Sequence, residues 1–281
     1  MDSKEEIDSE ALKNNVEYFI ENKVHGIVVG GSTGEFVTLS IKEHKAIIND
    51  VVKQVNGRIP VIAGTAACST NRVIELTEYA KNAGADGAMI VPPFYSKLNE
   101  NELFEHFRTV AENVDIPIML YNNPWTTKVD MQPSLIARLA EIENISYVKE
   151  STGDITRIWK ILSLAGENIT VFCGSDNIAL ESFIMGAKGW ICVAANFIPK
   201  QVSRLYELAC IERDFKKAQV LYKRLLPSLN FLEDTGKFAQ LAKAGLEIVG
   251  RKAGPVRKPL LPATDKELQM FTTILNKIQQ T

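Results

Sequence analysis

IPIMLYNNP at residues 116–124 and ISYVKESTGD at residues 145–154 form the stretch that decides the fold of this chain. Each begins with a continuous apolar run of strand type and ends in polar residues. Continuous apolar runs are typical of parallel strands that are buried on both faces. Between them, QPSLIARLAEI (132–142) places apolar residues at helical spacing. The stretch therefore predicts a strand, a crossover helix and a second strand parallel to the first.

The same unit recurs along most of the chain. Apolar runs of strand type lie at 24–31, 59–65, 86–93, 116–122, 145–151, 169–175 and 189–196. Amphipathic stretches with charged faces lie at 40–55, 69–84, 100–114, 132–142, 156–166 and 177–187. The first of these opens with Ser40 and has Glu43 three residues later, which matches a capping box at a helix start. Repeated strand–helix units of this kind predict a parallel sheet inside one domain.

Two architectures accommodate these units, a (β/α)8 TIM barrel and an open doubly wound sheet. The turn after the first apolar run is GGSTGE (30–35), which does not match the G-x-G-x-x-G fingerprint of dinucleotide-binding open sheets. We therefore predict an α/β fold with a TIM-barrel catalytic domain over residues 1–198. Residues 199–281 lack strand signals and read as two or three amphipathic helices plus a last one. We predict that they form a C-terminal helical appendage of the same domain.

The sequence pattern lacks the expected first strand of the barrel. Residues 10–23 predict a helix, and a polar, acidic segment precedes it where a strand should lie. Either the first strand lies upstream of this start, or the barrel closes in another way. Without that strand, the edges of the neighbouring strands are exposed unless another chain covers them.

The composition excludes several classes of protein. Hydrophobic residues make up 46% and charged residues 23% of the 281 residues, which is typical of a globular chain and not of a disordered one. The net charge of -2 lacks the basic excess that nucleic-acid binding requires. No apolar run reaches the roughly 20 residues of a membrane helix, and the polar start does not resemble a signal peptide. We expect a cytoplasmic protein without nucleic-acid or membrane partners.

The cysteines and histidines do not indicate a metal site or a cofactor. The chain has three histidines and four cysteines, and no C-x-x-C pair. Cys68, Cys173, Cys192 and Cys210 lie in apolar stretches and are expected to be buried and reduced. We expect no metal and no cofactor, which argues against a metal-dependent class II aldolase on the same fold.

Candidate catalytic residues follow the apolar runs, because the active site of a TIM barrel lies at the carboxyl ends of its strands. Lys149 ends one run, where a lysine is rarely found unless it is paired or used in catalysis. A desolvated amine at this place can attack a 2-oxo acid and form a Schiff base. The alternative is a structural lysine that forms an ion pair with Glu150 or Asp154.

Tyr121 ends the preceding run, so its phenol is expected near Lys149, where it can transfer protons to intermediates formed on the amine. The alternative is an aromatic residue that only caps the core. Ser32 and Thr33 lie between glycines after an earlier run and offer hydroxyl and backbone N–H groups to a carboxylate. Such turns are common, so this signal is weak on its own.

Five motifs in this order, on successive strands, carry a family resemblance. They are GGSTGE (30–35), PPFY (92–95), YNNP (121–124), KESTGD (149–154) and GSD (174–176), and together they resemble the dihydrodipicolinate synthase / N-acetylneuraminate lyase family. The resemblance implies a Schiff-base class I lyase on an (α/β)8 barrel with C-terminal helices. It implies a small-molecule substrate, pyruvate or another small 2-oxo acid, and no cofactor. It also implies a homotetramer built as a dimer of dimers.

The resemblance assigns roles to individual residues. Lys149 would form the imine, Tyr121 would shuttle protons, and Ser32 would be the relay hydroxyl beside it. Tyr95 matches the tyrosine that family members lend to the active site of the neighbouring subunit. The residues that would bind the substrate, by holding its carboxylate or lining the opposite wall, are Ser32, Thr33, Gly34 and Val193.

The sequence departs from the family pattern where the substrate is chosen. Authentic dihydrodipicolinate synthases read like Y-N-x-P-S-R-T-G, and their arginine grips the carboxylate of the aldehyde substrate. Here Trp125 and Thr126 replace Ser-Arg, and a threonine cannot replace a bidentate guanidinium. Lys128 offers a charge two residues later but without the fork. Neuraminate lyases carry Gly-x-Asp-Glu where this chain has Asn177 instead of the glutamate, which argues against sialic acid.

Three functions remain open. The leading hypothesis is a Schiff-base lyase or synthase that acts on a small 2-oxo acid through Lys149. The second is the dehydratase or deaminase branch, because residues 237–262 resemble 1-pyrroline-4-hydroxy-2-carboxylate deaminases and keto-deoxy-sugar-acid dehydratases. The third is a catalytically silent barrel that binds a keto acid. The joint presence of Lys149, Tyr121, Tyr95 and Ser32 argues against this third hypothesis.

Overall fold

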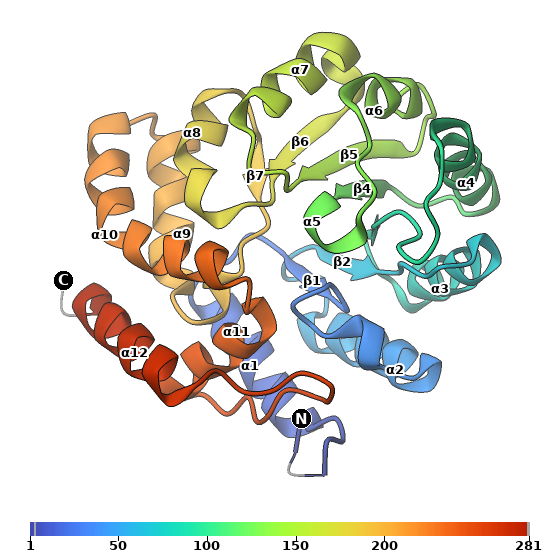
Figure 1. Ribbon diagram of the computed structural model, residues 1–281. Helices are drawn as coiled ribbons and strands as arrows, with labels where there is room; N and C mark the ends of the chain where they lie inside the picture. Colours follow the sequence, from blue (N-terminus) through green and yellow to red (C-terminus); the bar gives the residue numbers. More distant parts are fainter. Residues whose placement is uncertain (3, 280–281) are drawn as a thin grey trace.

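A curved sheet of seven parallel strands forms the centre of the molecule (Figure 1). The computed structural model describes residues 1–2 and 4–279, and within them the strand order follows the sequence from β1 to β7. The strands are β1 Ile27–Val29, β2 Val61–Gly64, β3 Gly87–Ile90, β4 Ile118–Asn122, β5 Ile145–Glu150, β6 Thr170–Cys173 and β7 Gly189–Trp190. The prediction of a TIM-barrel fold with seven visible strands is confirmed.

Helices alternate with the strands and cover the outside of the sheet (Figure 1). They are α1 Ser9–Glu21, α2 Ile41–Val55, α3 Thr70–Ala83, α4 Glu100–Asn113, α6 Pro133–Leu139, α7 Ile155–Ala165 and α8 Ala179–Ile184. A further short helix, α5 Pro124–Thr127, lies in the loop after β4 and not outside the sheet (Figure 1). The predicted capping box of α2 is present. The Ser40 hydroxyl accepts the Glu43 N–H at 3.2 Å, and the Glu43 carboxylate accepts the Ser40 N–H at 2.8 Å. This pair satisfies two of the N–H groups that a helix start leaves free.

The C-terminal part of the described chain contains four α-helices, as the sequence pattern predicts. They are α9 Pro199–Tyr206, α10 Phe215–Thr235, α11 Phe238–Ile248 and α12 Asp265–Gln279. Phe271 of α12 stacks on Phe231 of α10 with the ring centres 5.6 Å apart, and it meets Phe197 edge to face at 5.2 Å. Strands β3 to β6 and these helices contribute to one hydrophobic core, so α9 to α12 are packed firmly against the barrel.

The last predicted strand, 189–196, is much shorter than expected. Only Gly189–Trp190 pairs with β6, and the 3-10 helix Ala194–Asn196 follows. The cause is Asp176, whose carboxylate accepts the N–H groups of Val193 at 3.2 Å and Ala194 at 2.9 Å. These bonds turn the backbone away from the sheet, and no periodicity of the sequence reveals them.

The barrel wall is open between β1 and β7, because the described residues supply no strand that joins the two. A cavity of about 790 Å³ lies along this opening, lined by residues of both strands, of α1 and of the loop 30–35. The segment before α1 and α1 itself contact the C-terminal part of the chain. Lys252 forms an ion pair with Asp8 at 2.6 Å, and its carbonyl accepts the Asn15 side chain at 2.9 Å.

The cysteines are free thiols, but one of them differs from the expectation. Cys173 is buried and Cys192 and Cys210 are half-buried, whereas Cys68 is exposed in the loop after β2. The expectation of burial is therefore wrong for Cys68, because β2 ends at Gly64 and Cys68 lies beyond it in an exposed part of the loop. Within the described ranges, none of the helices has the length and apolar character needed to cross a membrane.

Candidate active site

Lys149 and Tyr121 meet at the carboxyl ends of β4 and β5. The two strands are parallel, and their register pairs Tyr121 with Lys149 directly. The Lys149 Nζ atom lies 4.0 Å from the centre of the Tyr121 ring. Both side chains are buried, with 7% of Lys149 and 5% of Tyr121 exposed. The structure therefore brings together the amine and the phenol that the strand-end argument selects.

The phenol of Tyr121 titrates under two opposing influences. Burial alone raises the pKa of a phenol, because it disfavours the charged phenolate. The Lys149 ammonium and the hydrogen bond from the Asn123 side chain act in the other direction and outweigh burial, so the pKa of Tyr121 lies below its usual value of 10.0. A phenol with a lowered pKa gives up its proton more readily, which suits a proton shuttle.

Neither of the alternative partners of Lys149 binds it. Glu150 lies beside Arg157, and the Asp154 carboxylate accepts the N–H and hydroxyl of Thr156 at the start of α7. In the described part of the chain, Lys149 takes part in no ion pair. The hypothesis of a structural lysine paired with Glu150 or Asp154 is therefore not supported.

Gly174 explains how the lysine fits into the crowded strand end. A Cβ atom at this position would lie 1.8 Å from the Ser151 hydroxyl and 2.9 Å from both Cγ and Cε of Lys149. Real Cβ atoms do not approach that closely, so the space is available only next to a glycine. The glycine of the GSD motif is thus a packing requirement of Lys149.

Three residues of the loop 30–35 and Val193 lie on the same cavity as Lys149. Ser32, Thr33 and Gly34 line it from the end of β1, and Val193 lines it from the turn after β7. Among the described residues, Ser32 forms no hydrogen bond with Tyr121. The structure thus gathers the predicted substrate-binding residues around one cavity, but it does not place Ser32 in contact with the phenol.

The C-terminal helices hold this loop in place through Glu35. Its backbone is left-handed, with φ at 60°, and its side chain is only 3% exposed. The carboxylate forms an ion pair with Lys243 of α11 at 2.5 Å and accepts the backbone N–H of Arg257 at 2.8 Å. The last residue of GGSTGE is therefore the anchor of the loop, a role that the sequence analysis missed.

Tyr95 lies apart from this cavity. It follows β3 in an outward loop, and 91% of its side chain is exposed. The residues that line the cavity do not include it. Within one chain, the structure therefore does not bring Tyr95 together with Lys149.

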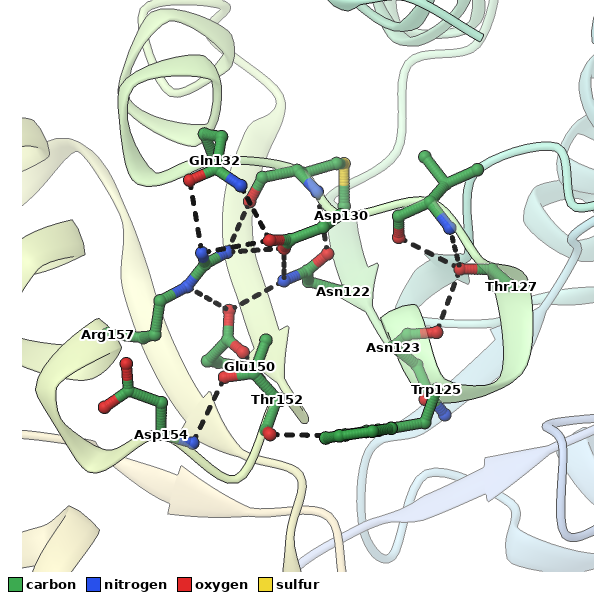
Figure 2. A network of polar contacts seen from close by, with 12 residues as sticks. Asn122, Asn123, Trp125, Thr127, Asp130, Gln132, Glu150, Thr152, Asp154 and Arg157 are labelled. Atoms are coloured by element: carbon green, nitrogen blue, oxygen red, sulfur yellow. Dashed lines mark hydrogen bonds and ion pairs between the residues drawn. The ribbon is translucent and has the colours of Figure 1, made fainter. Parts of the chain in front are cut away.

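A polar network lies behind the carboxyl ends of β4 and β5 (Figure 2). Asn122 and Glu150 follow Tyr121 and Lys149 by one residue, and they point to the opposite face of the sheet because strand side chains alternate. The Asn122 amide nitrogen donates to Glu150 and to Asp130, both at 3.0 Å, and its oxygen accepts the Met131 N–H at 3.0 Å. Both ends of this fully buried amide are therefore satisfied.

Arg157 of α7 completes the network from the other side. Its guanidinium donates to the two oxygens of Asp130 at 2.7 and 3.2 Å and to the Met131 carbonyl at 2.7 Å. Its Nε lies 3.8 Å from Glu150. Burial raises the pKa of Glu150, although the hydrogen bonds from Thr152 and Asn122 and the charge of Arg157 oppose this effect. The network ties the loop after β4 to the loop after β5.

Trp125 joins the same two loops at the mouth of the site (Figure 2). Its indole N–H donates to the Thr152 carbonyl at 3.0 Å, while 72% of the side chain is exposed. The exposed Lys128 ammonium donates to the Trp125 carbonyl at 2.7 Å, which ties it to the loop. Thr126 is exposed and uncharged at the place of the family's arginine. This loop therefore carries no guanidinium.

The buried Asp176 and the half-buried Glu233 form a second acidic group. Burial raises the pKa of Asp176, whose carboxylate accepts the N–H groups of Ala194 and Val193 and the indole N–H of Trp190. These donors occupy the aspartate of the GSDN motif, so it is not available for sugar hydroxyls. The Glu233 carboxylate of α10 accepts the Asp176 N–H at 2.6 Å. Among the described residues, no group of three or more His, Cys, Asp or Glu side chains is arranged to hold a metal ion.

Glu233 should make the stability of the protein depend on pH. Burial first, and then the Asp176 carboxylate, raise the pKa of Glu233 from 4.5 to about 7. Between these two values the folded chain binds more protons than the unfolded chain, so the free energy of unfolding falls as the pH rises. Glu233→Gln removes this loss, because an amide keeps the acceptor oxygen without a charge. At about pH 8 we expect the free energy of unfolding of Glu233→Gln to exceed that of the wild type by on the order of 2 kcal/mol.

Urea unfolding of both proteins at about pH 5 and about pH 8 measures this difference, since contributions from other groups cancel in the comparison. A difference that is the same at both pH values would mean that Glu233 does not titrate in this range.

Several residues that the sequence analysis missed have partners far away in the chain. Asn122 lies inside YNNP and Asp130 lies two residues before a predicted helix, so both have visible signals, yet nothing in the sequence shows that Arg157 joins them. Asn123 and Glu233 have no signal in the sequence. Their roles depend on which side chains the fold brings within hydrogen-bonding distance.

Comparison with known proteins shows which family the chain resembles in sequence and in fold. A sequence profile of the Dihydrodipicolinate synthetase family matches residues 1–278. A Methanoculleus marisnigri protein named 4-hydroxy-tetrahydrodipicolinate synthase is 41% identical over 276 residues, which cover 98% of this chain and 94% of that protein. A crystal structure of a dihydrodipicolinate synthase is 36% identical and superposes with a TM-score of 0.95, over 100% of this chain and 96% of that one.

A further solved structure adds a ligand to the comparison. The chloride-inhibited dihydrodipicolinate synthase of Acinetobacter baumannii, complexed with pyruvate, is 35% identical to this chain. It superposes with a TM-score of 0.95 over 99% of this chain and 95% of that one.

Proposed function

Because the chain belongs to the Dihydrodipicolinate synthetase family of Schiff-base class I lyases, we propose that Lys149 is its imine-forming residue and that pyruvate or another small 2-oxo acid is its substrate. The predictions of family and enzyme class are confirmed. The observation that carries the assignment to Lys149 is its burial against the Tyr121 ring at the carboxyl ends of two neighbouring strands.

The chemistry follows from this geometry. The unprotonated Lys149 amine attacks the ketone carbon, and the carbinolamine forms as one proton passes from the attacking nitrogen to the former carbonyl oxygen. The phenol of Tyr121 then gives its proton to the leaving hydroxyl, water departs, and the nitrogen lone pair completes the C=N bond. The imine withdraws electrons from the adjacent carbon, so that a C–C bond can be made or broken there.

The carboxylate of the 2-oxo acid is assigned to the loop after β1. Ser32 and Thr33 supply hydroxyl groups, and the backbone N–H groups around Gly34 add further donors along the cavity that Lys149 lines. Val193 lines this cavity from the turn that Asp176 holds. This arrangement orients the ketone carbon toward the amine before the reaction.

The second substrate distinguishes the branches of the family. The names of the curated relatives suggest condensation with an aldehyde to give 4-hydroxy-tetrahydrodipicolinate. Thr126, in place of the arginine that grips the carboxylate of this aldehyde, argues for an acceptor without a carboxylate at that end. Dehydration or deamination of a larger 2-oxo acid is the alternative, because it needs the imine but no aldehyde.

Borohydride reduction in the presence of pyruvate tests the central step. The imine should be trapped as an adduct with the mass of pyruvate less one water plus two hydrogens, and peptide mapping should place it on Lys149. Consumption of pyruvate with aldehydes that carry or lack a distal carboxylate then assigns the branch. An adduct confined to another lysine, or no adduct with any 2-oxo acid, would rule out the proposal.

The exposure of Tyr95 supports an assembly of several chains. A tyrosine that is 91% exposed is expected to be covered by a neighbour if it is the residue that family members lend across subunits. We propose the homotetramer that the family resemblance implies, and light scattering of the purified protein checks it. Four free cysteines fit a cytoplasmic location, where thiols stay reduced.

A further inference from the structure

Asn123 contacts the phenol oxygen of Tyr121 from the loop after β4. Its side-chain nitrogen donates to the phenol oxygen at 3.0 Å, and its side-chain oxygen accepts the Thr126 N–H at 3.3 Å. A backbone N–H can only donate, so the amide oxygen must face Thr126 and the amide nitrogen must face the phenol. The orientation of the amide is thus set by its two partners.

The loop holds Asn123 rigidly in this position. Its backbone carbonyl accepts the N–H and the hydroxyl of Thr127, at 3.0 and 2.9 Å. The loop is fixed further along by the Trp125 bond to Thr152 and by the Arg157 bonds to Asp130. The amide is therefore in place before any substrate arrives, which is what preorganised stabilisation requires.

We propose that Asn123 is a positioning residue that donates to the phenol oxygen of Tyr121 and thereby directs the phenol's own proton to substrate atoms bonded to Lys149. A phenol has one proton to donate, and the amide occupies one side of its oxygen. The proton is left for an acceptor on the other side. This inference rests on the proposed function only in the role that it gives to Lys149.

The step in which this bond matters is the loss of water from the carbinolamine. The phenol proton moves to the leaving hydroxyl, the C–O bond breaks, and the nitrogen lone pair forms the C=N bond, which leaves a phenolate. Lys149 is the charged group beside the phenol, but its nitrogen carries no charge in the carbinolamine. The Ser151 hydroxyl is buried nearby and also favours the phenolate of Tyr121, but it has no well-aligned hydrogen bond in the described structure. Asn123 is then the donor that is already aligned with the developing phenolate.

Asn123 stands at the variable position of the family's Y-N-x-P pattern. The family resemblance therefore assigns it no role, and the sequence offers no other signal for it. Its contact with Tyr121 emerges only from the way α5 turns back over the end of β4.

Two substitutions separate the contact with the phenol from the contact with Thr126. Asn123→Asp keeps an oxygen acceptor for the Thr126 N–H and loses the donor to Tyr121. Asn123→Ala loses both. Asn113→Asp is the matched control, because Asn113 is exposed on α4 and its side chain bonds only the Thr109 carbonyl.

Two measurements are made on each variant. The phenolate absorbance of Tyr121, obtained by subtracting the titration of the same variant with Tyr121→Phe, reports the phenol without any catalysis. The rate of borohydride-trapped imine formation with pyruvate, followed across pH, reports the proton transfer. We expect Asn123→Asp to move the phenolate titration to higher pH and to slow imine formation by about tenfold or more. The control Asn113→Asp should match the wild type in both measurements.

The outcomes are distinct. If Asn123→Asp behaves like the wild type in both measurements, the inference is overturned, whatever Asn123→Ala does. If only Asn123→Ala is impaired, the role of Asn123 is to cap the helix. Circular dichroism and thermal unfolding establish that each variant is folded. If the wild type forms no adduct, the proposed function fails, whereas the phenolate titration still decides whether Asn123 controls the phenol.

Discussion

Lys149→Ala should abolish the pyruvate adduct and lower turnover by roughly four orders of magnitude or more. The reason is that, within the described structure, Lys149 carries the only amine on β4 and β5, and every later step proceeds on the bond that this amine forms. The methyl group of the alanine cannot attack the ketone, so no carbinolamine forms for the Tyr121 phenol to protonate. Intact-protein mass spectrometry after incubation with pyruvate and borohydride measures the adduct directly.

Lys188→Ala provides the matched control for this experiment. Lys188 lines the same cavity but is exposed, directly before β7, and has no aromatic ring over its amine. We expect it to keep the adduct. An adduct that persists in folded Lys149→Ala, or one that disappears in Lys188→Ala, would contradict the assignment and move the imine to another amine.

Arg157→Met should lower the free energy of unfolding by about 3–5 kcal/mol. The substitution keeps the bulk of the aliphatic chain but leaves the buried Glu150, with 2% of its side chain exposed, next to Asp130 without a cation. An uncompensated buried charge is expensive, and the Met131 carbonyl also loses its donor. Urea unfolding monitored by circular dichroism measures the change.

Arg108→Met is the control for the loss of an arginine. Arg108 forms ion pairs with Glu105 and Glu112 on the exposed face of α4, where such pairs contribute below about 1 kcal/mol. Combining Arg157→Met with Glu150→Gln should recover part of the loss, because the amide no longer carries the charge that Arg157 balances. Equal destabilisation by Arg157→Met and Arg108→Met would show that the network adds nothing beyond a surface pair.

Lys149 and Tyr121 could be predicted from the sequence because parallel strands bring their carboxyl ends to one rim. Once the apolar runs are identified, the residue that ends each run is a candidate, and direct register between neighbouring strands brings two such residues together. The loop 30–35 was found by the same argument. The role of Glu35 as the anchor of this loop could not be found in this way, because Glu35 and its partner Arg257 lie 222 positions apart in the chain.

The polar contacts around the site could not be predicted for a related reason. Asp176 could equally have pointed into the cavity, and only the fold shows that its carboxylate turns toward the N–H groups of Val193 and Ala194. That choice shortens β7 and shapes the wall of the cavity. Glu233 reaches the same aspartate from α10, in a part of the chain where the sequence shows only helices.

The sequence alone determined the order of strands and helices, the start of α2 and the place of Tyr121 and Lys149 near the carboxyl ends of their strands. These features follow from local rules, because side-chain periodicity records which face of an element is buried and a capping box involves residues three positions apart. The tertiary structure alone decided that Lys149 lies against the Tyr121 ring instead of pairing with Glu150 or Asp154, and that Asn123 reaches the phenol oxygen. Hydrogen bonds and close packing act over a few ångströms, so they depend on which distant residues the fold brings into contact.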